Sequence, residues 1–211
     1  MARLLVVTAV AAERDAILRG AADAELTVIV GGVGPAAAAA ATAHALATAS
    51  PRYELVLSAG IGGGFAPVAP GELAIATSIA FADLGAESPA GFVPVSALGF
   101  ADERYPVAED VSGWLAGRTG GRLGSILTVA TVTGSATTAA ALRGRFPDAV
   151  AEGMEGAGIA AAAQPAGIAF GEIRAISNAV GPRDRSSWQI PAALAALSQA
   201  FVAVTAGDWA R

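Results

Sequence analysis

The chain has no cysteine, no lysine and a single histidine, His44, among its 211 residues. The lack of cysteine excludes disulfides, thiolate metal sites and thiol nucleophiles. A lone histidine also excludes histidine-based metal clusters and nearly every Ser-His or Cys-His catalytic arrangement. Any chemistry therefore has to use carboxylates, amides, hydroxyls or the backbone, and we expect neither a metal nor a cofactor.

Charge is scarce as well. Charged residues make up 15% of the chain, and the net charge is −5. The 13 basic residues are all arginine and are scattered, which argues against nucleic-acid binding. The longest apolar stretch, residues 156–163, is too short to cross a bilayer. The apolar run 4–12 resembles a signal peptide, but its residues 4–7 favour a buried first strand instead. We therefore expect a cytoplasmic protein that binds neither nucleic acid nor membrane.

Short apolar runs alternate with alanine-rich helical runs, which is the pattern of an α/β domain. Strands are predicted at residues 4–8, 26–30, 55–59, 73–80, 125–131 and 168–176. Helices are predicted at residues 13–18, 35–49, 111–117, 137–146, 156–163 and 192–206. No shift in composition and no repeat divides the chain, so we expect one domain over residues 1–211. The irregular stretch 83–106 is expected to be a functional or mobile loop.

Two glycine-rich segments follow predicted strands. Residues 32–37 fit the G-x-G-x-x-A fingerprint of dinucleotide sites, but Glu54 begins the next strand where the fingerprint needs an acid at its end. A tight strand-to-helix turn is therefore the favoured interpretation. Residues 58–65 hold four glycines in five positions, which favours a loop whose backbone N–H groups a ligand can approach closely. A merely flexible loop is the alternative.

The candidate catalytic groups are carboxylates at junctions between strands and helices. Glu13 and Glu155 both lie at such junctions, and in an open α/β sheet these ends line the ligand crevice. The alternative is that each only stabilises its helix N-terminus, by about 0.3–1 kcal/mol. Asn178 ends the last apolar run, where a turn-forming residue is the plain alternative.

Five segments occur in the order typical of the purine nucleoside phosphorylase/hydrolase superfamily. They are residues 9–13 (Ala-Val-Ala-Ala-Glu), 31–34 (Gly-Gly-Val-Gly), 58–65, 153–156 (Gly-Met-Glu-Gly) and 174–178 (Arg-Ala-Ile-Ser-Asn). From residue 4 to about residue 201 the chain resembles the nucleosidase branch, which includes methylthioadenosine/S-adenosylhomocysteine nucleosidases, and more narrowly the futalosine hydrolase family of menaquinone biosynthesis. The resemblance implies a three-layer α/β/α domain around a twisted mixed sheet. It also implies a homo-oligomer, either a dimer or a dimer of dimers.

The resemblance further implies three catalytic residues. Glu13 matches the carboxylate that activates the attacking water, Glu155 matches the one that binds the ribose hydroxyls, and Asn178 stands where the family places its base-recognising Asp or Asn. The expected substrate-binding residues are Val33, Ile61, Gly62, Gly63, Phe81, Thr137, Met154, Ser177, Trp188, Arg183 and Arg185.

Two positions narrow the expected reaction. Adenine-cleaving relatives carry Asp at position 178, whereas the amide of Asn178 donates well to O6 and N7 of a 6-oxopurine. Phosphorolytic relatives place a hydroxyl residue at position 61 and an arginine about three residues earlier, where this chain has Ile61 and Ser58. The resemblance therefore implies hydrolysis of futalosine, a small-molecule nucleoside, to hypoxanthine. The alternatives are a methylthioadenosine-type nucleosidase, a purine nucleoside phosphorylase and a nucleoside-binding or storage protein without catalysis.

The chain departs from the family pattern at two positions. Gly153 stands where nucleosidases often carry an acid, and Glu152 lies one residue earlier. Thr137 stands where adenine nucleosidases carry a phenylalanine against the base, so Phe81 or Trp188 would have to stack on it instead.

Futalosine carries a carboxyphenyl group extended from the 5′ side of its sugar. We predict that Arg183 or Arg185 holds its carboxylate, because a planar guanidinium matches a carboxylate with two parallel hydrogen bonds. A solvated Arg-Asp-Arg turn is the alternative.

Overall fold

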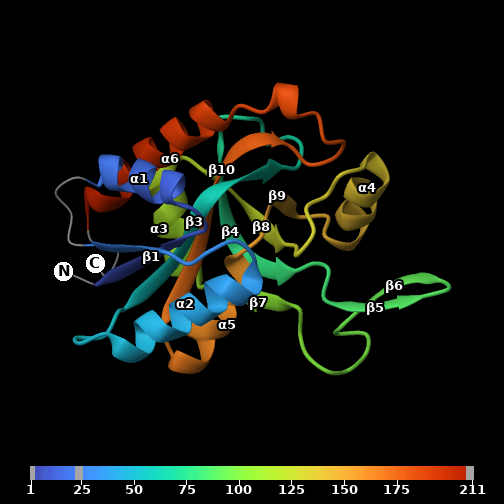
Figure 1. Cartoon of the computed structure of the whole chain (residues 1–211), viewed down its shortest axis with the longest axis horizontal. Helices are drawn as coiled ribbons and strands as arrows, with labels where there is room; N and C mark the ends of the chain where they lie inside the picture. The colour runs from blue at the N-terminus through green and yellow to red at the C-terminus, as the bar shows by residue number, and fades with distance from the viewer. Residues whose placement is uncertain (1–2, 22–25, 208–211) are drawn as a thin grey trace.

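The computed structural model describes residues 3–21 and 26–207, so the remaining residues of the expected 1–211 domain lie outside the described residues. The strands are β1 (Leu4–Thr8), β2 (Leu26–Val30), β3 (Leu55–Gly64), β4 (Leu73–Phe81), β5 (Gly85–Ser88), β6 (Gly91–Pro94), β7 (Arg104–Pro106), β8 (Arg122–Thr128), β9 (Ala149–Gly153) and β10 (Ala169–Ala179). The helices are α1 (Ala11–Gly20), α2 (Pro35–Thr48), α3 (Glu109–Thr119), α4 (Ala136–Arg145), α5 (Gly156–Ala163) and α6 (Ile190–Thr205), with short 3-10 turns at Gln164–Ala166 and Arg185–Ser187 (Figure 1).

Eight strands form one mixed sheet in the order β10-β4-β8-β9-β3-β1-β2, with β7 paired to β4. Strand β3 also pairs with β10, so the path from β10 through β4, β8 and β9 to β3 closes on itself. The length of β3 allows this closure, because β1 pairs with its first residues and β9 pairs with Gly63 and Gly64 near its end. The predicted α/β fold with a mixed sheet is confirmed.

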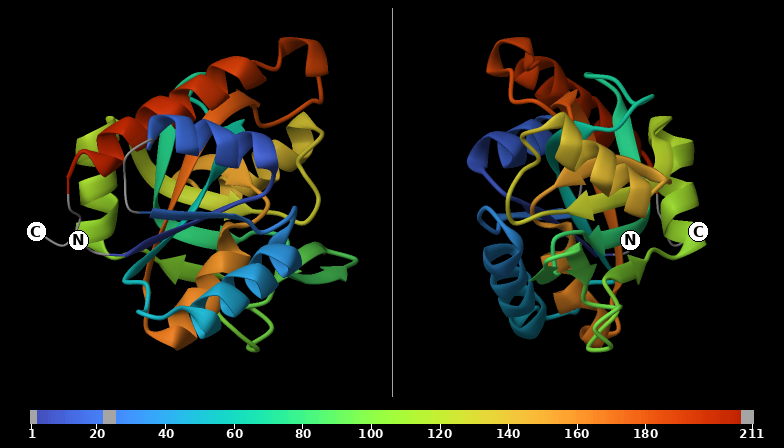
Figure 2. Two further views of the ribbon diagram at one scale, coloured as in Figure 1. Left: turned by 60° about the vertical axis from the view of Figure 1, so that its left-hand side comes forward. Right: turned by 90° about the vertical axis from the view of Figure 1, so that its right-hand side faces the viewer.

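Helices cover both faces of the sheet. Helices α1, α3 and α6 lie over one face, and α2 and α5 lie over the other (Figures 1 and 2). Strand β1 shows the reason, because Leu4 and Val6 belong to the same buried cluster as Phe201 of α6, whereas Leu5 and Val7 belong to the cluster shared with α2 and α5. A strand buried on both faces has a continuous apolar sequence, as this one does.

Small residues let the helices approach each other closely. A Cβ atom added to Gly158 of α5 would overlap the backbone of Pro35 in α2, and one added to Gly20 of α1 would overlap the carbonyl oxygen of Ser198 in α6. These glycines therefore set the distance between the helices within each outer layer.

The structure corrects several sequence-based predictions of secondary structure. The stretch 83–106 is not an unstructured loop, because it holds the β5–β6 hairpin, which projects from the body of the molecule, and β7 (Figure 1). The glycine segment 58–65 is not a loop either, since β3 continues to Gly64. Strand β9 was not predicted. No helix within the described parts of the chain is long and apolar enough to cross a bilayer.

The close helix contact predicts a contrast between two glycine-to-alanine changes. Gly158→Ala should lower the free energy of unfolding by about 1–3 kcal/mol, because its methyl group collides with the backbone of α2. Gly113→Ala, at a helical position with open space around it, should raise the same quantity by up to about 1 kcal/mol. Urea unfolding measures both. Equal stability of the two variants would contradict the packing described here.

Candidate active site

A cavity of about 280 Å³ opens at the carboxyl ends of β1, β3 and β10, which run parallel. Ligands of open α/β sheets bind at such ends. The predicted residues that line it are Glu13, Val33, Ile61, Gly62, Gly63, Met154, Glu155, Ser177, Asn178, Arg183 and Trp188. The cavity thus brings together segments that are far apart in the sequence.

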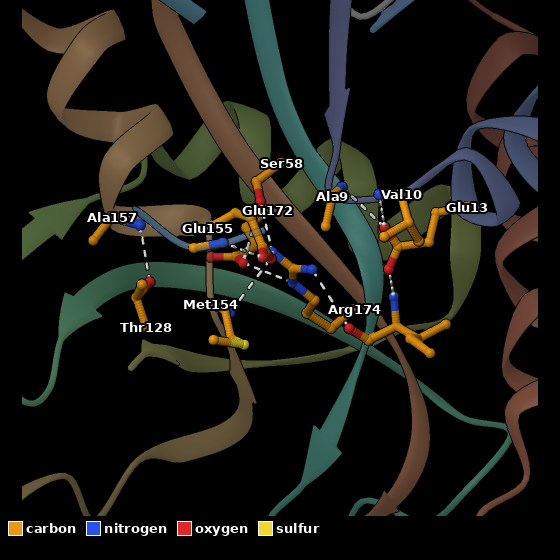
Figure 3. A network of polar contacts seen from close by, with 12 residues as sticks. Ala9, Val10, Glu13, Ser58, Thr128, Met154, Glu155, Ala157, Glu172 and Arg174 are labelled. Atoms are coloured by element: carbon orange, nitrogen blue, oxygen red, sulfur yellow. Dashed lines mark hydrogen bonds and ion pairs between the residues drawn. The ribbon is translucent and has the colours of Figure 1, made fainter. Parts of the chain in front are cut away.

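Backbone groups from two elements hold the carboxylate of Glu13. Its Oε2 accepts hydrogen bonds from the N–H groups of Ala9 (2.9 Å) and Val10 (3.2 Å), which connect β1 to α1. Its Oε1 accepts a third from the N–H of Ile61 in β3, at 2.9 Å (Figure 3). A Cβ atom at Gly60 would lie 2.5 Å from Oε1, so this position has to be glycine. The carboxylate therefore stabilises the start of α1 and is also fixed against the sheet.

The carboxylate of Glu155 serves a different purpose from helix capping. The residue stands at the N-cap of α5, but its side chain caps no N–H of that helix. Instead, Oε1 accepts the N–H of Gly34 at 3.1 Å, and Oε2 lies 3.1 Å from Nη2 of Arg174. Gly34 is the residue just before α2, and its φ of +90° is a conformation that favours glycine. The G-x-G segment thus supplies a donor to a carboxylate.

Arg174 is buried beneath the cavity and joins several elements. Its Nε donates to Glu172 at 2.8 Å, and its Nη2 donates to the hydroxyl of Ser58 at 2.9 Å (Figure 3). The guanidinium also explains Gly153, because a Cβ atom there would lie 2.8 Å from Nε. Sequence reasoning assigned no role to Arg174 or Glu172. The available signal was two charged residues inside the apolar run of a central strand.

The charges of this network are coupled. Burial alone disfavours a charged guanidinium, but the carboxylates of Glu172, Glu155 and Glu13 outweigh it and raise the pKa of Arg174, so this side chain stays a cation. Burial also raises the pKa of the Glu172 carboxyl, against the opposing effect of Arg174. One cation thus faces several carboxylates, which leaves the floor of the cavity with an excess of negative charge.

A third acid, Glu152 of β9, also lines the cavity, although sequence reasoning gave it no role. Its side chain is buried, and its two oxygens accept hydrogen bonds from the N–H (2.9 Å) and the hydroxyl of Thr133, which follows β8. Burial raises the pKa of Glu152, while the bonds from Thr133 act in the opposite direction. The only sequence signal was a lone acid within a short apolar run.

The amide of Asn178 has a defined orientation. The hydroxyl of Ser177 donates to its Oδ1 at 2.8 Å, and its Nδ2 donates to the carbonyl of Ala179 at 2.9 Å. Asn178 pairs with Gly63 of β3, and a Cβ atom at Gly63 would lie 3.5 Å from Nδ2. These two contacts leave one N–H and one oxygen lone pair of the amide free for a ligand.

Three predicted residues do not line the cavity. Phe81 ends β4 and packs against the main core, and Thr137 is exposed on α4. Arg183 and Arg185 both stack on Trp188, with guanidinium carbons 5.4 and 5.8 Å from the ring centroid, but only Arg183 lines the cavity.

Comparison with known proteins identifies the family of the chain. The chain matches the phosphorylase superfamily over residues 7–206. It is 49% identical to a futalosine hydrolase of Streptomyces coelicolor, over 93% of this chain and 92% of that protein. It is 46% identical to one of Acidothermus cellulolyticus, over 96% and 90% respectively. The chain belongs to the futalosine hydrolase family of the phosphorylase superfamily.

The fold of this futalosine hydrolase family member is also found in solved structures of nucleosidases. A methylthioadenosine/S-adenosylhomocysteine nucleosidase from Colwellia psychrerythraea, in complex with adenine, has a TM-score of 0.81 at 20% identity and covers 97% of this chain and 95% of its own. The corresponding nucleosidase from Neisseria meningitidis, in complex with methylthio-immucillin-A, has a TM-score of 0.79 at 22% identity and covers 98% and 100%. At these identities the likeness establishes a shared fold.

The raised pKa of Glu152 predicts a pH dependence of stability. A carboxyl whose pKa is higher in the folded state binds its proton more tightly there, so the free energy of unfolding falls as pH rises from about 4.3 through the raised value. Glu152→Gln removes this titration. The unfolding free energy of the parent chain minus that of the variant should therefore decrease between about pH 4 and pH 7.5.

Urea unfolding at each pH measures this difference. Glu87→Gln, at an exposed position of the β5–β6 hairpin, is the matched control for losing one carboxylate. A difference at Glu152 that stays constant, or that grows with pH, would contradict the prediction.

Proposed function

We propose that this chain hydrolyses the N-glycosidic bond of futalosine and releases hypoxanthine and dehypoxanthinyl futalosine. The observation that carries the proposal is the convergence of two buried carboxylates, Glu13 and Glu155, and one oriented amide, Asn178, on a single cavity. Membership of the futalosine hydrolase family supports the same substrate.

Glu13 acts as the general base. N-glycosidic cleavage proceeds through an oxocarbenium-like transition state, and a positioned carboxylate that takes a proton from the attacking water contributes about 10²–10⁴-fold. The three backbone hydrogen bonds to Glu13 hold its carboxylate at one place in the cavity wall. This fixed position supports the role of general base, because the rate of proton transfer depends on how precisely the carboxylate is placed against the attacking water.

Glu155 binds the ribose hydroxyls, with Met154 beside it against the sugar. Each oxygen of Glu155 has one strong contact, with Gly34 or with Arg174, and an ionised carboxylate has further acceptor positions for two hydroxyl donors. The negative charge of Glu13 and Glu155 also stabilises the positive charge that develops on the sugar.

Water is the nucleophile rather than phosphate. Ile61 offers phosphate no hydroxyl, and the hydroxyl of Ser58 is fully buried against Arg174 and so points away from the cavity. The guanidinium of Arg174 is itself occupied by carboxylates. These contacts argue against a purine nucleoside phosphorylase.

Asn178 stabilises the departing base. After its bond to Ala179 the amide keeps one N–H for a ligand, and O6 and N7 of hypoxanthine are both acceptors. Adenine presents an amino group at position 6, which an N–H donor does not match. An amide here, where adenine-cleaving relatives carry Asp, argues against a methylthioadenosine-type nucleosidase.

We further propose that the chain acts as a single domain and assembles into a homo-oligomer in the cytoplasm. Phe92, Leu98 and Phe100, in or close to the hairpin that projects from the body, are large apolar side chains with 38–82% of their surface exposed. Several exposed apolar side chains in one short segment of the chain support an association surface.

The direct test is chromatography of the products formed from futalosine, inosine and methylthioadenosine, each with and without phosphate. We expect hypoxanthine from futalosine at a rate that does not depend on phosphate. Glu13→Gln, as the catalytic control, should lower turnover by about 10²–10⁴-fold. Release that needs phosphate, adenine from methylthioadenosine, or tight binding without turnover would each overturn the proposal.

The position of Arg183 predicts that removing its side chain raises KM only for substrates that carry a distal carboxylate. Arg183→Ala should raise KM for futalosine about tenfold, because it removes a charge-assisted hydrogen bond at a partly solvated site. The KM for inosine, which lacks the carboxyphenyl group, should stay within about twofold. Arg185→Ala is the matched control, since Arg185 stacks on the same Trp188 but does not line the cavity. Equal effects of the two variants on futalosine would contradict the role of Arg183.

A further inference from the structure

The proposed function leaves one acid of the cavity unused. Gly63 of β3 pairs with Glu152 of β9 on one side and with Asn178 of β10 on the other. Residues that pair across a sheet direct their side chains to the same face. Glu152 and Asn178 therefore stand on one face, two strand spacings apart, which is about 9–10 Å. Gly63 lies between them, with the side chain of Val180 packed against it.

This part of the cavity wall can accommodate a flat base. A Cβ atom at Gly63 would lie 2.8 Å from the side chain of Val180, so Val180 packs closely against Gly63, and both residues line the cavity. A bicyclic base lying against this apolar surface could make hydrogen bonds of about 2.9 Å with both Asn178 and Glu152. Both residues line the same cavity, as this arrangement requires.

The carboxylate of Glu152 has free acceptor positions. An ionised carboxylate has about four lone-pair sites, and the N–H and hydroxyl of Thr133 occupy one on each oxygen. These two bonds fix its orientation and oppose the effect of burial, which raises the pKa of Glu152. Because Thr133 leaves a lone-pair site free on each oxygen, Glu152 offers acceptors to the cavity.

Along the edge of hypoxanthine, N7 and O6 are acceptors, and the next ring atom, N1, carries a hydrogen. We propose that Glu152 accepts the N1–H of hypoxanthine and is the residue that excludes adenine, whose N1 would direct a lone pair at the carboxylate. Asn178 and Glu152 then recognise one contiguous edge, acceptor–acceptor–donor. This inference rests on the proposed function, in which Asn178 faces N7 and O6.

The test compares futalosine with 6-amino-6-deoxyfutalosine, which differ only in the base. Glu152→Gln keeps the shape of the side chain and an acceptor for Thr133, but places an amide N–H where the carboxylate was. The kcat/KM for futalosine should fall about 10–100-fold, because a charge-assisted hydrogen bond is lost. The ratio of the two kcat/KM values should shift at least about tenfold toward the amino congener.

A second variant weakens the orientation of Glu152 without removing its carboxylate. Thr133→Val removes the hydroxyl contact to Glu152 but leaves the N–H contact in place. The ratio should therefore shift in the same direction as in Glu152→Gln, but by a smaller factor. An unchanged ratio in Glu152→Gln, or a larger shift of the ratio in Thr133→Val than in Glu152→Gln, would overturn the inference.

A second measurement needs no variant and no turnover. Calorimetric titration of the unaltered protein should show hypoxanthine binding at least about tenfold more tightly than 1-methylhypoxanthine, which has no N1–H to donate. Equal affinity for the two bases would overturn the role of Glu152. Failure to cleave futalosine would instead overturn the proposed reaction, so the two failures are distinguishable.

Discussion

The buried guanidinium of Arg174 is the interaction on which the rest of the site depends. A cation removed from water is costly unless carboxylates and hydroxyls surround it, and here Glu172, Ser58 and Glu155 do so. These partners come from β10, from β3 and from the start of α5. Because all of them need the same guanidinium, the two central strands and the helix that begins at the cavity are held in one relative position, and with them the carboxylate of Glu155.

The same packing explains why glycines surround this network. A side chain at Gly60 would collide with Glu13 and with Arg174, and one at Gly153 would collide with Arg174. At the glycines of positions 62–64 the nearest atoms belong to backbone carbonyls or apolar side chains. The glycine-rich pattern of β3 therefore reflects the close approach of neighbouring segments to a strand rather than the flexibility of a loop. The expectation of a loop was wrong because glycine composition favours both structures, and only the neighbours of each glycine distinguish them.

Much of the fold was predictable, since β1 and β2 are apolar runs with clear ends. Glu13 and Glu155 were identifiable as acids near the starts of predicted helices, and Asn178 as a polar residue near the end of the last apolar run. Sequence periodicity could not predict contacts between distant segments. Ser58 meets Arg174 across 116 positions of the chain, and Glu152 meets Thr133 across a loop. Phe81 and Thr137 came from a resemblance, which places a residue along the chain but does not give the direction of its side chain.

The imbalance of charge connects the proposed nucleophile with the proposed base recognition. Glu13, Glu152 and Glu155 line the cavity together with one cation, Arg183, while Arg174 beneath it is already shared with the buried Glu172. Such a cavity attracts positive charge developing on a sugar and repels a phosphate anion, which supports water as the nucleophile. The same excess disfavours a base that turns a lone pair toward Glu152. The excess of negative charge thus supports both the use of water rather than phosphate and the preference for hypoxanthine over adenine. Neither a metal ion nor a histidine is needed to explain these two preferences.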